Sequence, residues 1–165
     1  MKCLTICQPW AWAIVGDSAG GVTIDGPKRI ENRPWLMTYR GPLLIHAGKS
    51  EKFWGDGLRG WWDRNVVKPM LPAPGLVPWG SVCGVAYVHG AYELRAEALL
   101  MANTLRLPDQ EPFASQHPGA KYILFSHARA FEKPVPWRGQ QFLFDVPESA
   151  VPEVDSILRG WGVRP

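Results

Sequence analysis

The sequence predicts an α+β fold: a small mixed β-barrel of five to six short strands, closed or nearly closed, with helices packed outside. Three observations favour it. The 165 residues are 46% hydrophobic and 20% charged, enough for one core, so we expect a single domain over residues 1–165. Its 16 prolines and 17 glycines divide the chain into short elements and exclude long helical arrays. Apolar runs of strand length also alternate with helical patterns.

The amino-terminal elements are a strand and a short helix that follows it. Residues 2–7 form a β-branched, apolar run that predicts the strand. Pro9 suits the first position of a helix, because the N–H group that it lacks would have no partner there, and residues 10–15 are compatible with that helix. Residues 16–26 are small, polar and without periodicity, so we expect an exposed loop.

Five further strands and three helices are expected along the rest of the chain. The strands are apolar or β-branched runs, at residues 28–33, 42–47, 81–89, 122–131 and 141–146. The helices carry apolar residues at helical spacing, over residues 50–65, 94–105 and 154–161. Ser50 is the expected cap of the first of these helices. The proline-rich segment 67–79 and residues 108–119 are expected to be loops.

Composition and cysteine spacing exclude several classes of protein. No run of about 18 apolar residues is present, so we expect a soluble protein without a membrane span. Gln8 and Pro9 interrupt the amino-terminal apolar run, which argues against a signal sequence and favours the cytoplasm. Cys3, Cys7 and Cys83 cannot all pair and lack a CxxC spacing, so we expect core cysteines. We therefore expect neither a metal nor a cofactor.

Positive charge gathers in one segment, although the net charge of the whole chain is only +3. Residues 28–49 hold a single carboxylate, that of Glu31, against the cationic side chains Lys28, Arg29, Arg33, Arg40 and Lys49. A local basic face of this kind can contact phosphates. Surface lysines and arginines are just as often only solvated, so composition leaves both interpretations open.

Three pieces of the chain, residues 8–12, 28–33 and 39–49, together resemble the ASCH family, a branch of the PUA-like superfamily. In that family a G-x-K-x-x-E-x-R signature lines a cleft between the barrel and the first helix. Its four positions are filled here by Gly26, Lys28, Glu31 and Arg33. The resemblance covers roughly residues 2–49 and implies a PUA-like barrel that binds nucleic acid. The loop before Lys28 is longer than in the family, which would change access to the cleft.

The residues of this region suit nucleotide binding. Free N–H groups at the start of the first helix can hold a phosphate or carbonyl oxygen. Lys28 and Arg33 can hold a phosphate or a base edge, and Glu31 can accept a hydrogen bond from an exocyclic amine. Trp10 or Trp12 offers a stacking face worth about 1–3 kcal/mol per base. The predicted nucleotide-binding residues are Pro9, Trp10, Ala11, Trp12, Lys28, Glu31, Arg33, Tyr39, His46 and Lys49.

Strand geometry supplies a competing interpretation. On a regular strand Glu31 and Arg33 share one face, and Lys28 points to the other unless the strand starts later or bulges. Glu31 would then pair with an arginine on a solvated surface. His46 lies in an apolar strand, where interior histidines are commoner than catalytic bases. Lys49 reaches either the mouth of the cleft or only solvent.

Three functions remain open. The first is a module that binds RNA or another single-stranded nucleic acid, with a nucleotide or modified base in the basic cleft. The second is a hydrolase, either a ribonuclease or an enzyme similar to the PUA-like relatives that hydrolyse the acyl amide of N4-acetylcytidine, with Lys28, Glu31 and Lys49 as catalytic residues. Those relatives have a threonine at the position of Glu31. The third is a protein-interaction module built on the tryptophan-rich segment 53–62.

Overall fold

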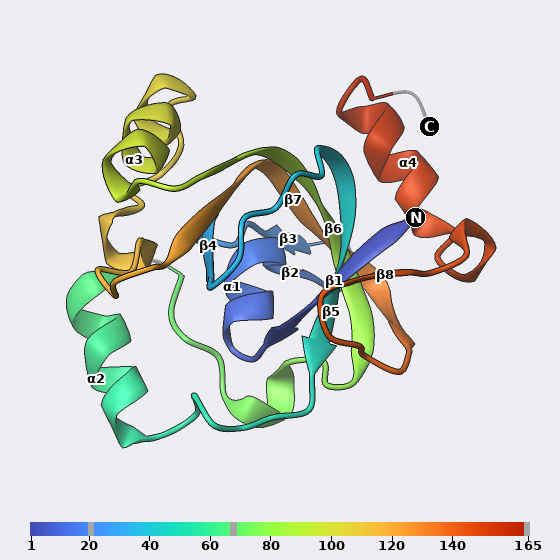
Figure 1. Cartoon of the computed structure of the whole chain (residues 1–165). Helices are drawn as coiled ribbons and strands as arrows, with labels where there is room; N and C mark the ends of the chain where they lie inside the picture. The colour runs from blue at the N-terminus through green and yellow to red at the C-terminus, as the bar shows by residue number, and fades with distance from the viewer. Residues whose placement is uncertain (20–21, 67–68, 164–165) are drawn as a thin grey trace.

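The computed structural model of the chain describes residues 1–19, 22–66 and 69–163 (Figure 1). The strands within these residues are β1 (Lys2–Cys7), β2 (Asp17–Ala19), β3 (Val22–Ile24), β4 (Ile30–Arg33), β5 (Gly41–Gly48), β6 (Ser81–Tyr92), β7 (Lys121–Pro136) and β8 (Leu143–Asp145). The α-helices are α1 (Trp10–Val15), α2 (Asp56–Asn65), α3 (Arg95–Thr104) and α4 (Glu153–Gly160). Short 3-10 turns lie at Pro74–Leu76, Glu111–Phe113 and Glu148–Ala150.

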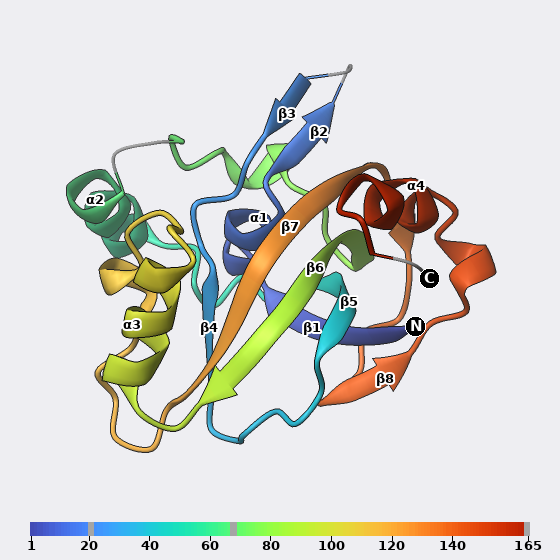
Figure 2. The same cartoon turned by 90° about the horizontal axis from the view of Figure 1, so that it is seen from above.

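Six of the strands form one curled sheet in the order β4-β7-β6-β5-β1-β8 (Figure 2). The β1–β5 pair is parallel, and the other neighbours run antiparallel. Register shifts interrupt the long β6–β7 ladder, and such irregularities bend a sheet. The sheet curls into a half-barrel with helices around it, which confirms the predicted α+β class. It remains open, because the edge strands β4 and β8 are not paired with each other.

The main core lies inside the curl, where the sheet wraps around α1 (Figure 1). Ala11, Ile14 and Val15 of α1 are buried against strand residues of the inner face. Gly84 permits this close approach, since a Cβ there would lie 2.9 Å from the Cβ of Val15. A second cluster covers the outer face, where Val154 and other apolar residues of α4 pack.

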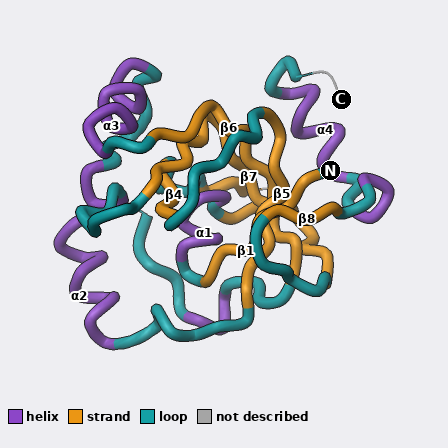
Figure 3. The backbone as a smooth tube through the Cα atoms, in the orientation of Figure 1, coloured by secondary structure: helices purple, strands orange, loops and turns teal. Residues whose placement is uncertain are grey.

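The helices α2, α3 and α4 lie outside the sheet, as the purple segments of Figure 3 show. Trp62 of α2 is fully buried and packs with Trp12 of α1, at 5.8 Å between ring centroids, and with Phe113 at 6.2 Å. These tryptophans therefore join α2 to the body of the protein. Helix α3 buries Ala98 and Ala102 against a separate cluster beside β4 and β7.

Two expectations for local structure are wrong. Segment 16–26 contains the two-stranded β2–β3 hairpin instead of an irregular loop, and residues 20–21 lie outside the described residues. Its strand β3 is wholly exposed and therefore shows no pattern of buried residues. Helix α2 begins at Asp56 after Gly55, so Ser50 does not cap it.

Element boundaries also differ from those expected. Strand β4 begins only at Ile30, whereas β6 and β7 continue to Tyr92 and Pro136 through their mutual pairing. The proline-rich loop is described from residue 69 onward, so residues 67–68 of the expected loop lie outside the described residues. Among the described helices, none is both long and apolar enough to cross a lipid bilayer.

Candidate functional site

A cleft of about 880 Å³ opens beside the edge strand β4. Four segments that are distant in sequence line it: the end of β1, residues 31–34, residues 52–61 before and within α2, and residues 112–115. Trp10 at the start of α1 and Lys28 complete the lining. Volumes of about 300–1,000 Å³ are typical of pockets that enclose small ligands. The cleft therefore has room for a nucleoside.

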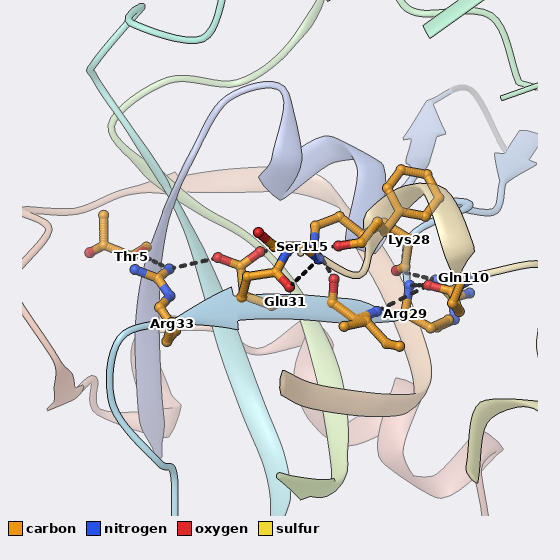
Figure 4. A network of polar contacts seen from close by, with 10 residues as sticks. Thr5, Lys28, Arg29, Glu31, Arg33, Gln110 and Ser115 are labelled. Atoms are coloured by element: carbon orange, nitrogen blue, oxygen red, sulfur yellow. Dashed lines mark hydrogen bonds and ion pairs between the residues drawn. The ribbon is translucent and has the colours of Figure 1, made fainter. Parts of the chain in front are cut away.

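Glu31 is the centre of a buried ionic network on the β4 wall (Figure 4). Its Oε2 lies 3.1 Å from Nζ of Lys28, and its Oε1 lies 3.1 Å from Nη2 of Arg33. The exposed fractions of the three side chains are 3% for Lys28, 10% for Glu31 and 23% for Arg33. Two cations and one carboxylate leave a net positive charge on this wall of the cleft. The alternative of a solvated pair on the sheet surface is wrong, because Glu31 is buried.

The late start of β4 explains how Lys28 and Glu31 meet. Because Lys28 precedes the strand, the alternation of faces does not apply to it, whereas Glu31 and Arg33 share one face of β4. The ammonium of Lys28 also donates to the carbonyl of Ile30, and Nη2 of Arg33 donates to the carbonyl of Thr5 at 2.8 Å. Thus Arg33 links the edge strand β4 to β1.

Gln110 holds the backbone that leads into β4. Its Oε1 accepts hydrogen bonds from the N–H groups of Arg29 and, at 3.1 Å, Ile30. Its Nε2 donates to the carbonyl of Pro27 at 2.9 Å. Only 2% of Gln110 is exposed, so these bonds are shielded from water. Gln110 therefore fixes the turn from which Lys28 projects.

Asn32 holds the backbone of residues 113–115, which form another part of the cleft wall. Its Nδ2 donates to the carbonyl of Phe113 at 2.7 Å, and its Oδ1 accepts from the N–H of Ser115 at 3.0 Å. Arg29 turns away from the cleft and donates to the carbonyls of Ile14 and Gly26. Asn32 thus joins β4 to a segment about 80 positions away in the sequence.

Aromatic rings form the wall that faces the ionic network. The ring of Trp10 lies edge-on to Trp61 at 5.7 Å and to Phe53 at 6.2 Å between centroids. Trp61 also contacts Phe113 at 6.1 Å. Nζ of Lys52, at the same wall, lies 4.6 Å from the centroid of Phe53. Aromatic faces opposite a polar wall suit a flat, partly polar ligand such as a nucleobase.

Burial lowers the pKa of Lys28 from its ordinary value of 10.5, and the neighbouring Glu31 carboxylate opposes this effect. Between the lowered pKa and 10.5 the unfolded chain binds more protons than the folded protein, so folding stability rises with pH in that window. We expect the free energy of unfolding of the wild type to increase relative to that of Lys28→Met as pH rises toward 10.5. Urea unfolding of both proteins between pH 7 and 10 measures this difference.

The substitution Lys133→Met, at an exposed lysine, is the matched control and should leave the pH profile parallel to that of the wild type. A free energy of unfolding of the wild type that falls relative to that of Lys28→Met as pH rises would contradict the assigned effect of burial.

Of the predicted site residues, Trp10, Lys28, Glu31 and Arg33 line the cleft together. Pro9, Ala11 and Trp12 do not belong to its lining. Ala11 and Trp12 point into the cores around α1, and the N–H of Trp12 donates to Oε1 of Gln8 at 3.0 Å. The N–H of Trp12, next to the groups at Trp10 and Ala11 that were expected to hold an anion, is therefore satisfied within the protein.

The other three predicted residues also lie outside the lining of the cleft. Tyr39 donates its hydroxyl to the carbonyl of Pro42. His46 is buried, its Nε2 lies 3.0 Å from the carbonyl oxygen of Trp137, and burial lowers its pKa. Lys49 is exposed, and its aliphatic stem packs on Gly80.

Several residues of the site were not predicted from sequence. They are Cys7, Asn32, Phe53, Trp61, Gln110 and Phe113. Phe53 and Trp61 belong to the tryptophan-rich segment that was assigned to a protein interface or to helix packing. No local pattern distinguishes Gln110 or Asn32, because their partners lie about 80 positions away in the sequence.

No family model matches the sequence, and no curated protein does. Among solved structures, the chain is similar to the crystal structure of ASCH from Zymomonas mobilis, with 14% identity and a TM-score of 0.50 over 94% of each chain. A mutant form of that protein gives 15% identity and a TM-score of 0.50 over 94% of this chain and 96% of the other. The likeness shows the fold and confirms the ASCH-type architecture that residues 2–49 predicted.

Proposed function

We propose that this chain, which has the ASCH fold, binds RNA by holding one nucleotide in the cleft beside β4. One observation carries the proposal: the buried carboxylate of Glu31 sits between two cations on one wall of a cavity large enough for a nucleoside. Burying three charges is unfavourable unless they are well paired. A wall of this kind suits the directional recognition of a polar ligand.

The donor and acceptor groups of the network that have no partner among the described residues of the protein indicate which ligand would fit. Each carboxylate oxygen of Glu31 has a second lone-pair site, which can accept from an exocyclic amine of a base. The Lys28 ammonium has three N–H donors and uses two within the protein. A base edge that presents a donor beside an acceptor therefore matches this wall. The rings of Trp10 and Phe53 contribute stacking.

A hydrolase is the second candidate, and the lowered pKa of Lys28 favours it. A buried amine beside a carboxylate is a pair that can transfer protons to and from a reacting group. Lys28 and Glu31 both line the cleft, whereas Lys49 does not, so the catalytic roles would fall on the first two. The third candidate, a protein-interaction module, has less support because Trp62 is buried and Trp61 is partly buried in the lining of the cleft.

Substitution of Glu31 by glutamine tests base recognition. RNA that copurifies with the protein at low salt is digested, and its nucleosides are quantified by mass spectrometry. We expect one nucleoside to be enriched with the wild type and to lose that enrichment with Glu31→Gln, because a glutamine presents one acceptor and one donor in place of two acceptors. Unselective RNA in both preparations would contradict recognition of the base and leave only phosphate contact.

Gly57 provides a matched steric control. A Cβ at this lining position has no neighbour within 4 Å, so Gly57→Trp adds a large ring at the cleft without a clash and without replacing a member of the ionic network. We expect Gly57→Trp to lose the bound RNA as well. The same preparations, incubated with RNA and with N4-acetylcytidine, separate the candidates: product formation that needs Lys28 would favour the hydrolase.

A further inference from the structure

We propose that the ligand of the cleft is one nucleotide within a single-stranded RNA chain, and that the next base stacks on the aromatic pair of partly buried Trp35 and exposed Phe142. This inference rests on the proposed function and extends it from a nucleotide site to a path for a polymer. It assigns a role to two residues outside the cleft lining.

The two rings form a platform at the surface. Their centroids lie 5.8 Å apart with planes tilted by 56°, and Phe142 is 62% exposed. Trp35 is partly buried and packs against the inner core. The exposed ring of Phe142, which packs on Trp35, can therefore offer a stacking face to a base.

The platform adjoins the Arg33 end of the cleft. Pro34 lines the cleft, and Trp35 is the next residue. Arg33 is bonded to the carbonyl of Thr5, at the end of the network opposite Gln110 in Figure 4. The segment that carries Phe142 reaches the same place, because a Cβ on Gly139 would lie 2.9 Å from Oγ1 of Thr5. An RNA chain that leaves the cleft past Arg33 therefore meets the Trp35–Phe142 pair.

The backbone of Phe142 supports a functional role. Its φ is +58°, a left-handed conformation that residues other than glycine, asparagine and aspartate seldom adopt. Strained positions of this kind concentrate at ligand sites. The adjacent cations favour RNA over a protein as the occupant, since Arg33 lies at the cleft and Arg138 is exposed in the same segment as Phe142.

The test compares a polymer with monomers. A fluorescein-labelled RNA hexamer of random sequence is titrated by anisotropy, and the four nucleoside 5′-monophosphates are titrated by NMR of the tryptophan indoles. We expect Phe142→Asn to weaken hexamer binding about tenfold, equivalent to about 1.4 kcal/mol, and to leave monophosphate binding unchanged. Asparagine tolerates the positive φ, so the backbone is preserved.

Three further variants complete the design. Phe142→Tyr retains the ring and should bind the hexamer like the wild type, as should Leu76→Asn, which removes an exposed apolar side chain away from the cleft. Gly57→Trp should lose both ligands. Hexamer affinity that is unchanged in Phe142→Asn would overturn the inference and leave the pair as a surface for another partner, while the proposed function would stand. Equal loss of both ligands would overturn it too; a wild type that binds neither would contradict the proposed function itself.

Discussion

Replacement of Glu31 by alanine is expected to lower the free energy of unfolding by about 3–5 kcal/mol, because it leaves the buried charge of Lys28 without its counterion. In the wild type the side chain of Lys28 is only 3% exposed, so its ammonium depends on protein partners instead of water. Urea unfolding at neutral pH, followed by tryptophan fluorescence, measures the change. The loss should be partly recovered in the double variant Lys28→Met with Glu31→Leu, since apolar side chains of similar size can replace a buried ion pair at little cost.

An exposed pair serves as the control. Glu93 lies 3.5 Å from Lys121 with 63% of its side chain exposed, and Glu93→Ala is expected to change stability by less than about 1 kcal/mol. Glu31→Ala and Glu93→Ala with equal effects would show that the network around Glu31 is solvated. That result would also remove the observation on which the proposed function rests.

Replacement of Gln110 by leucine is expected to lower the free energy of unfolding by about 2–5 kcal/mol, because a buried polar group without a partner costs about 1–3 kcal/mol. The substitution leaves the N–H groups of Arg29 and Ile30 and the carbonyl of Pro27 without their partner. It also frees the turn that carries Lys28. RNA binding should therefore weaken in Gln110→Leu even under conditions where the protein is fully folded.

The matched control is Gln116→Leu, in the same loop region but at an exposed position. We expect it to change stability by no more than about 0.5 kcal/mol and to bind RNA like the wild type. If Gln110→Leu were as stable as Gln116→Leu, the hydrogen bonds of Gln110 would contribute little to this turn. If Gln110→Leu were unstable but bound RNA normally when folded, Gln110 would support the fold without positioning the site.

Most strands and helices could be predicted from sequence, because each one leaves a local pattern of buried residues. Strand β5 and the buried start of β6 appear as continuous apolar runs, and α4 shows its buried Val154 and Leu158 at helical spacing. The β2–β3 hairpin could not be predicted in this way, because Val22 is 64% exposed and Ile24 is 42% exposed. Nothing in that hairpin alternates between core and solvent.

The start of α2 could not be predicted either. Apolar residues recur at helical spacing in segment 50–65. Gly55 nevertheless adopts an extended conformation with φ of −153°, so the helix begins after it. The hydroxyl of Ser50 accepts instead from the N–H of Lys52. Residues before Asp56 are therefore free to turn Phe53 and Lys52 toward the cleft, where a longer helix would have placed them differently.

The sequence by itself determined the polar chemistry of the site, because Lys28, Glu31 and Arg33 are close neighbours in the chain and belong to one recognisable pattern. Only the tertiary structure decided whether these three side chains border a cavity. The aromatic wall comes from residues 52–61 and 112–115, and the backbone at Arg29, next to Lys28, is fixed by Gln110 from 81 positions away. Short-range patterns record which face of an element is buried, whereas the juxtaposition of distant segments depends on how the whole sheet curls and pairs.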